Sequence, residues 1–150
     1  MHNLNLPLSS YQADLQTKIK SGKTYVLDPI RKKYVRLTPE EMVRQLLLQF
    51  LLQEQQWSKS LLAVEKTVRL GKRIKRFDLL IYSDTTRPFI LVECKSPNEP
   101  IRQKHFDQIM QYNIQLKAPY LWISNGPENY LATIDLENKR LIFKKKFDFS

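Results

Sequence analysis

The chain has 150 residues, of which 42% are hydrophobic, and 25 Lys and Arg against 15 Asp and Glu give it a formal net charge of +10. That length and apolar content suit a single compact domain, and the excess positive charge favours a polyanionic partner, nucleic acid first of all. No apolar run approaches the roughly 20 residues that cross a bilayer, and the first residues lack the basic start and apolar stretch of a signal peptide, so we expect a cytoplasmic protein with no membrane association.

Cysteine, histidine and glycine usage excludes further classes. Cys94 is the only cysteine, so no internal disulfide can form, and with two histidines in the chain a tetrahedral structural zinc site cannot be assembled. The three glycines lie far apart, so no glycine-rich loop can cradle a nucleotide phosphate. We therefore do not expect a structural zinc protein or a nucleotide hydrolase of the P-loop kind.

The N-terminal part of the chain carries weak signals. Residues 1–23 alternate irregularly between polar and apolar, which indicates an arm, or a short helix over residues 10–18. Residues 24–27 and 33–37 read as two short strands, and because Pro29 presets a turn between them, they predict a small hairpin. We expect residues 24–150 to form one domain that follows the arm.

A helix is predicted directly after this hairpin. Thr38 can act as its N-cap, Pro39 suits the first helical position, and Glu41 falls where a capping box places its acid. Apolar residues then recur at helical spacing, at Val43, Leu46, Leu47, Phe50 and Leu51. The pattern predicts a helix that ends at about residue 55 or 56.

The rest of the chain alternates between strand and helix patterns. Turn residues separate three β-like runs and favour an antiparallel meander, at residues 63–69, 74–82 and 89–95. A helix and three more strands follow, at residues 101–117, 120–124, 130–136 and 141–145. A strand, a helix and a further strand favour a right-handed crossover to a parallel neighbour. The predicted class is α/β (α+β), with a mixed sheet and the core order helix, three strands, helix, strand.

Charged side chains interrupt two of these apolar strands. Alternation places Glu93 and Lys95 on one face of the third run and Cys94 on the other, and pairing with the preceding run would bring Asp78 beside Glu93. Because such charges are costly to bury, the group is a candidate functional site. Two carboxylates and water suit Mg²⁺ or Mn²⁺, and a neighbouring ammonium can stabilise the transition state of phosphodiester hydrolysis.

Each of these residues also has a purely structural interpretation. Asp78 could pair with Arg76 or Lys95 as an ion pair, although a buried ion pair is a weak means of stabilising a fold. Glu41 is explained by the capping box without any metal. Cys94 faces away from the carboxylates in a regular strand, which suits a small core residue better than a nucleophile.

Basic residues gather in three clusters. Each cluster can be explained by solubility or by a solvated strand edge alone, but the presence of three such clusters favours phosphate binding. Two of them lie at residues 31–36 and 144–146. The third is a predicted hairpin that leads directly into Asp78 and could lay a nucleic-acid backbone beside a metal ion; it contains Arg69, Lys72, Arg73, Lys75 and Arg76.

The carboxylates and the lysine also follow a known pattern. Asp78, 14 intervening residues and then Glu93-Cys94-Lys95 resemble the signature of PD-(D/E)XK nucleases, with Phe77 standing where the proline of that signature would be. The resemblance implies that Asp78 and Glu93 are metal ligands, with the main-chain carbonyl of Cys94 as a third ligand. It implies that Lys95 is the catalytic ammonium.

A more specific resemblance covers most of the chain. Residues 25–41 and 43–45, together with Gln108 and Tyr112, look like the N-terminal nuclease domain of the R subunit of type I restriction enzymes. That likeness implies an αβββαβ core, Glu41 as an acid of the first helix near the metal, and Gln108 and Tyr112 near the substrate. Without it, Gln108 and Tyr112 would read as a surface pair or as helix packing.

We therefore predict an endonuclease domain that depends on Mg²⁺ or Mn²⁺ and hydrolyses phosphodiester bonds of DNA. The R subunits that it resembles continue into an ATP-driven translocase, and this chain ends at residue 150 without one, so self-contained ATP-dependent restriction is not expected. The alternative is a nuclease-like module that binds nucleic acid or docks another subunit and cuts nothing. The expected partners are DNA, other restriction or repair subunits and, since many nucleases of this type cut duplexes as pairs, a second copy of the chain.

Overall fold

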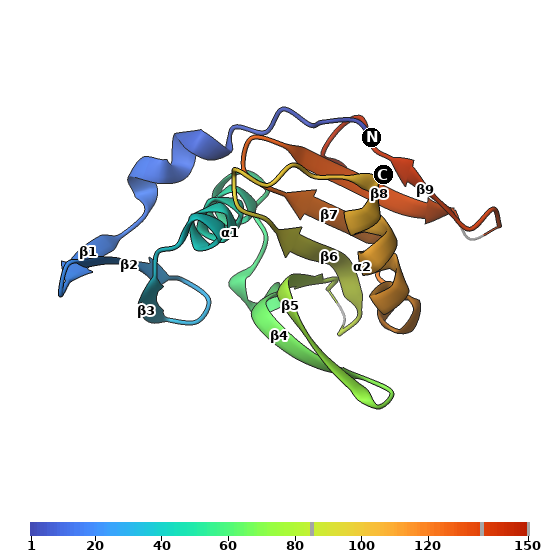
Figure 1. Ribbon diagram of the computed structural model, residues 1–150, viewed down its shortest axis with the longest axis horizontal. Coiled ribbons are helices and arrows are strands. Elements are labelled where there is room, and N and C mark those ends of the chain that lie inside the picture. Colours follow the sequence, from blue (N-terminus) through green and yellow to red (C-terminus); the bar gives the residue numbers. More distant parts are fainter. Residues whose placement is uncertain (85, 136, 150) are drawn as a thin grey trace.

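The computed structural model describes residues 1–84, 86–135 and 137–149, and within these ranges it has a small and a large β-sheet around two α-helices (Figure 1). The first residues run along the body of the molecule. Leu4 and Leu8 are buried in its core, and the Leu4 backbone N–H donates a hydrogen bond of 2.8 Å to the carbonyl of Asn129. A 3-10 helix, Leu8–Asp14, then leads to the small sheet.

The small sheet has three antiparallel strands in the order β1 (Thr17–Lys20), β2 (Lys23–Asp28) and β3 (Lys33–Arg36). The predicted hairpin is present as β2 and β3. The helix predicted over residues 10–18 is present only as far as Asp14, in the 3-10 helix, and is wrong at residues 17 and 18, which belong to β1. The cause is the two-residue turn Ser21-Gly22, in which both residues have positive φ, as tight hairpins between twisted strands require.

Thr38 is the N-cap of the first helix, α1 (Pro39–Gln49), as predicted, but the second half of the capping box is wrong: the Thr38 backbone N–H donates to the carbonyl of Arg36, and the Glu41 carboxylate accepts from Arg31, Arg44 and Gln45. The hydroxyl of Thr38 accepts a hydrogen bond of 3.1 Å from the backbone N–H of Glu41. The helical segment does not stop at Gln49 but continues as one turn of π-helix, Phe50–Glu54. The helical segment therefore ends close to the predicted position, with its last turn wound more widely than an α-helix.

The large sheet is mixed, as predicted. Its strands lie in chain order, and β6 and β7 are parallel while the other neighbouring pairs are antiparallel. The second helix, α2 (Gln103–Leu116), makes the crossover between β6 and β7. The strands are β4 (Leu62–Leu70), β5 (Arg73–Tyr82), β6 (Pro88–Cys94), β7 (Tyr120–Ser124), β8 (Asn129–Asp135) and β9 (Arg140–Phe143). Residue 136, which we predicted as the end of the strand that is now β8, lies outside the described residues.

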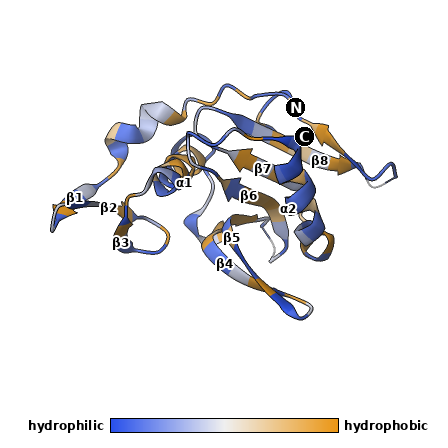
Figure 2. Cartoon of the chain, in the orientation of Figure 1, coloured by the Kyte–Doolittle hydropathy of each residue, from blue (hydrophilic) through white to orange (hydrophobic). Residues whose placement is uncertain are grey.

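The two helices cover opposite faces of this sheet, and apolar residues line its strands (Figures 1 and 2). Side chains of β6 point alternately to the two faces of the sheet, as predicted: Ile90 and Val92 pack on the α1 side, whereas Leu91 packs on the α2 side. The helix–strand order is therefore αβββαβ for the core. Within the described residues, no helix is long and apolar enough to span a membrane.

Candidate active site

The pocket that holds the predicted catalytic residues opens where β5 and β6 meet α2. Strand register places Leu79 opposite Val92, so Asp78 lies next to Glu93 at the polar end of the pair. The pocket has a volume of about 150 Å³. Its lining combines residues from α1, β5, β6 and α2: Glu40, Lys75, Arg76, Phe77, Asp78, Val92, Glu93, Cys94, Lys95, Gln108, Ile109 and Tyr112.

Asp78 is held firmly at the wall of this pocket. Its Oδ2 accepts a hydrogen bond of 2.8 Å from the backbone N–H of Cys94, and its Oδ1 accepts one of 3.1 Å from Nη2 of Arg44. Because each carboxylate oxygen has two acceptor sites, both oxygens can still serve a further ligand. The carboxylate is oriented in advance and keeps free acceptor capacity.

Glu93 and Lys95 enter the same pocket from the end of β6. Nζ of Lys95 lies 3.9 Å from Oε2 of Glu93 and 3.5 Å from Oε2 of Glu99. Burial raises the pKa of the Glu93 carboxyl above its usual value; Lys95 lowers it and the charge of Asp78 raises it again, with a net rise. Two carboxylates therefore share a small space in which a cation would relieve their repulsion.

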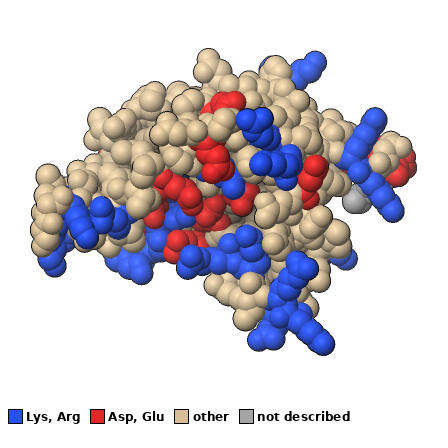
Figure 3. Space-filling model, viewed as in Figure 1, with Lys and Arg blue, Asp and Glu red and all other residues tan. Residues whose placement is uncertain are grey.

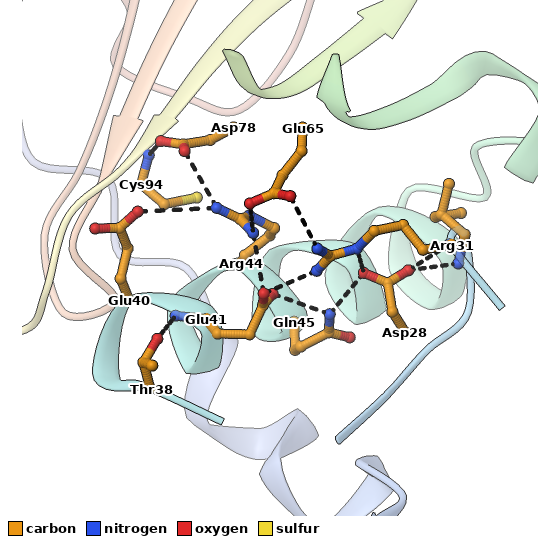
Figure 4. A network of polar contacts seen from close by, with 11 residues as sticks. Asp28, Arg31, Thr38, Glu40, Glu41, Arg44, Gln45, Glu65, Asp78 and Cys94 are labelled. Carbon is orange, nitrogen blue, oxygen red and sulfur yellow. Dashed lines mark hydrogen bonds and ion pairs between the residues drawn. The ribbon is translucent and has the colours of Figure 1, made fainter. Parts of the chain in front are cut away.

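The two acids at the start of α1 point in different directions (Figure 4). Glu40 lines the pocket, and the pKa of its carboxyl is raised by partial burial and then by the charge of Asp78. Glu41, which we predicted as the acid near the metal, does not line the pocket but accepts hydrogen bonds from Arg31, Arg44 and Gln45. Neighbouring helix residues face about 100° apart, so only one of the two can face the site.

Arg44 is the central residue that the sequence interpretation left without a role. Its guanidinium lies 3.0 Å from Glu41, 3.1 Å from Asp78 and 3.4 Å from Glu65 (Figure 4). Burial works against its charge, yet the carboxylates, Glu41 foremost, outweigh it and raise the pKa of Arg44. The signal in the sequence was an arginine on the apolar side of a helix, next to Val43, because such residues are buried only when paired.

A second cluster joins this network to the small sheet. Asp28 is fully buried and accepts hydrogen bonds of 2.7 Å from the backbone N–H groups of Ile30 and Arg31, 2.8 Å from Nε of Arg31 and 2.9 Å from Nε2 of Gln45. Burial works to raise the pKa of Asp28, but these donors outweigh it and hold that pKa below its usual value. Nη2 of Arg31 also forms an ion pair of 2.8 Å with Oε1 of Glu41. The loop between β2 and β3 is thus fixed to α1.

The helix α2 contributes the remaining predicted residues. Gln108 and Tyr112 line the pocket, Gln108 as an exposed side chain. The ring of Tyr112 packs edge-on against Phe77, with centroids 6.3 Å apart, and Nζ of Lys75 lies 4.9 Å from its centroid. Phe77 therefore helps to hold the tyrosine at the mouth of the pocket.

Basic side chains extend from the pocket along the β4–β5 hairpin. Lys75 and Arg76 line the pocket itself, and Arg69, Lys72 and Arg73 are exposed farther towards the tip. In the space-filling view, acidic residues gather at the centre of the face and basic residues flank them (Figure 3). This charge pattern allows phosphates to be held around a carboxylate centre that a metal ion would neutralise.

The donor chemistry of the pocket fits Mg²⁺ or Mn²⁺. Asp78 and Glu93 offer hard oxygen ligands, and Mg²⁺ commonly binds through one or two carboxylates and keeps several waters. Among the described residues there is no cluster of three or more His, Cys, Asp or Glu side chains arranged to hold a metal. The Cys94 thiol is buried on the α1 side, where burial raises its pKa well above the usual value, so it is a core residue.

Comparison with known proteins identifies the family of the chain. The family model described as "Type I restriction enzyme R protein N terminus" matches residues 39–147, from the first residue of α1 to a point beyond β9. The chain belongs to this family of type I restriction enzyme R protein N termini.

Among solved structures, the chain is similar to a fragment assigned to an HsdR subunit of a type I restriction enzyme from Vibrio vulnificus YJ016. The identity is 20% and the TM-score 0.49, and the similarity covers 74% of this chain and 23% of the other. This chain thus spans about a quarter of the length of that structure. A search of curated proteins gave no match.

Proposed function

We propose that this chain is a Mg²⁺-dependent nuclease domain of the PD-(D/E)XK type that hydrolyses phosphodiester bonds of DNA. One observation carries the proposal: Asp78, Glu93 and Lys95 line a single pocket, where β6 ends beside the middle of β5. Membership of a restriction-enzyme family supports DNA as the substrate.

Each residue of the pocket has a distinct task in this proposal. Asp78 and Glu93 hold the cation, with the main-chain carbonyl of Cys94 as a third ligand and Glu40, in place of Glu41, as the nearest further acid. When bound, Mg²⁺ supplies a Lewis acid that neutralises phosphate charge and activates water. Lys95 directs its ammonium at the scissile phosphate, where it stabilises the charge that develops on the oxygens.

The substrate backbone approaches along the basic hairpin. Lys75 and Arg76 stand at the pocket, so they contact the phosphates next to the scissile one, and Arg69, Lys72 and Arg73 hold phosphates farther away. Gln108, exposed beside the pocket, positions a phosphate oxygen or the attacking water by hydrogen bonding. Tyr112 provides a ring against the sugar or base.

Cleavage assays test the proposal directly. Supercoiled, linear and single-stranded DNA are incubated with Mg²⁺ or Mn²⁺, and Lys95→Ala should lower the rate by about 10²–10³-fold, the usual effect of removing one charge-stabilising donor. Lys139→Ala is the matched control, since it removes an exposed lysine at the β8–β9 turn, far along the sheet from the pocket. Cutting that persists unchanged in Lys95→Ala would show that the activity comes from elsewhere.

A nuclease-like module that binds DNA and cuts nothing is the second candidate. The observation that favours it is the engagement of Asp78, whose oxygens already accept from Arg44 and from the backbone of Cys94. In that case Mn²⁺ should leave the melting temperature unchanged and DNA should stay intact. Association with other restriction subunits, or with a second copy of the chain, is part of either proposal and is measured by light scattering and pull-down.

A further inference from the structure

The small sheet has two chemically different faces. Val26 and Asp28 point inward and are fully buried. The cross-strand row Lys18, Tyr25 and Arg36 must then lie on the outer face, because residues directly opposite each other share a face and alternate along each strand. We call this outer surface the Lys18 face; its members are Lys18, Lys20, Lys23, Tyr25, Tyr34 and Arg36.

The Lys18 face combines positive charge with aromatic rings. Its four cations are exposed, and within the described part of the chain none of them forms an ion pair with a carboxylate. Nζ of Lys18 lies 4.0 Å from the centroid of the Tyr34 ring. A hollow of about 300 Å³ opens here, lined by Lys18, Lys20, Ser21, Tyr25 and Tyr34. Exposed cations without acidic partners are free to bind phosphates.

The face is fixed in place relative to the candidate active site. Arg31, in the loop between β2 and β3, donates to Asp28 and Glu41 and lies 3.3 Å from Glu65 of β4. Four residues after Arg36, Glu40 lines the pocket. Seen from one side, the small sheet and the β4–β5 hairpin form two wings of the molecule, each with basic residues, and the acidic centre lies between them (Figures 1 and 3).

We propose that the Lys18 face binds the sugar–phosphate backbone of duplex DNA that extends past the pocket, so that one duplex rests on both wings. The inference rests on the proposed function and adds a second, separate contact with the substrate. Its lysines bind phosphates without reading sequence, since sequence is read at base edges. Tyr25 and Tyr34 pack against the sugars beside those phosphates.

Salt-dependent binding tests the proposal. Anisotropy of a labelled duplex is measured in EDTA, where no metal-dependent cutting occurs, at several salt concentrations. The variant Lys18→Gln, Lys20→Gln, Lys23→Gln should bind more weakly, and the slope of log K against log salt should fall by about 2.7, from three phosphate contacts at about 0.9 each. The control variant Lys59→Gln, Arg87→Gln, Lys139→Gln removes the same charge from exposed residues outside the three basic clusters and the Lys18 face, and it should keep the slope.

Equal slopes for the two triple variants, or wild-type protein that does not bind the duplex, would overturn the proposal. A second measurement is independent of any variant: DNA should protect Lys18, Lys20 and Lys23 from acetylation while Lys139 stays reactive, and equal reactivity would contradict the contact. Failure of the nuclease proposal is distinguishable. Wild-type protein that never cuts with Mg²⁺, yet shows the slope difference and the protection, refutes the catalytic assignment and supports this binding face.

Discussion

Replacing Arg44 by methionine should destabilise the domain strongly. The side chain of Arg44 is 5% exposed and lies 3.0 Å from Glu41 and 3.1 Å from Asp78, which are 9% and 22% exposed. Methionine fills similar space but leaves Asp78 without its ion-pair partner and leaves Glu41 with Arg31 as its remaining cation. Removing one partner of a buried ion pair costs about 3–5 kcal/mol. Glu40 and Glu65, at 50% and 35% exposed, add little because solvent screens them.

Urea unfolding at neutral pH measures this loss. A domain of this size has a free energy of unfolding of roughly 5–15 kcal/mol, so Arg44→Met should remain folded with a lower midpoint. Arg44→Lys is the control: it keeps the charge but loses the planar fork, so the expected loss is about 1.5–3 kcal/mol, one hydrogen bond to a charged group. An Arg44→Met protein as stable as the wild type would mean that the carboxylates do not depend on Arg44.

The same variant also probes the candidate metal site. Arg44 forms an ion pair with Asp78, and a bound cation would interact with the same carboxylate. Without the guanidinium, Mn²⁺ should therefore raise the melting temperature of Arg44→Met more than that of the wild type, because ligand that binds the folded state stabilises it by mass action. Equal shifts would refute the idea that Arg44 and the cation compete.

Three further outcomes are expected. Asp28→Asn should lower the free energy of unfolding by about 1.5–3 kcal/mol at neutral pH. Because the pKa of Asp28 is lowered in the folded state, its carboxylate stabilises the fold above about pH 3.9, and this stabilisation is lost as the pH falls through the lowered pKa. The urea unfolding curves of the variant and the wild type should therefore converge in acid. Glu93→Gln should be more stable than the metal-free wild type, because the raised pKa of Glu93 means that its ionised form destabilises the fold. The difference in free energy of unfolding should grow as the pH rises above about 4.3, and a difference that grows towards acid would contradict this. Glu40→Gln should weaken stabilisation by Mn²⁺ in melting assays, whereas Glu41→Gln should mainly lower stability without metal, and the reverse pattern would place Glu41 at the site.

The sequence allowed the core order to be predicted because each element has a local signal. Thr38 and Glu41 mark the start of α1, and apolar alternation marks β6. The strand β1 was missed because all its residues are exposed, so no hydrophobic pattern announces it. Its only signal was the Ser21-Gly22 turn.

The candidate site was predictable only in part, for a different reason. Asp78, Glu93 and Lys95 could be grouped because Asp78 and Glu93 lie in strands that pair with each other and Lys95 directly follows β6. Arg44 reaches Asp78 across 34 positions of sequence, and no local pattern encodes such a contact. The sequence also pointed to Glu41 and not to Glu40 at the pocket, because the spacing from Thr38 marks where the helix begins but not which of its first acids faces the pocket.

The chain of ion pairs from Asp28 to Asp78 has a practical meaning for anyone who wishes to move this pocket into another scaffold. Its wall is built from a loop, a helix and two strands that hold one another through Arg31 and Arg44. Transferring the strand segments alone would include the acidic residues but omit Arg31 and Arg44, which hold the carboxylates in position. The smallest segment to transfer along with the strands therefore starts at Asp28 and includes α1 at least as far as Gln45.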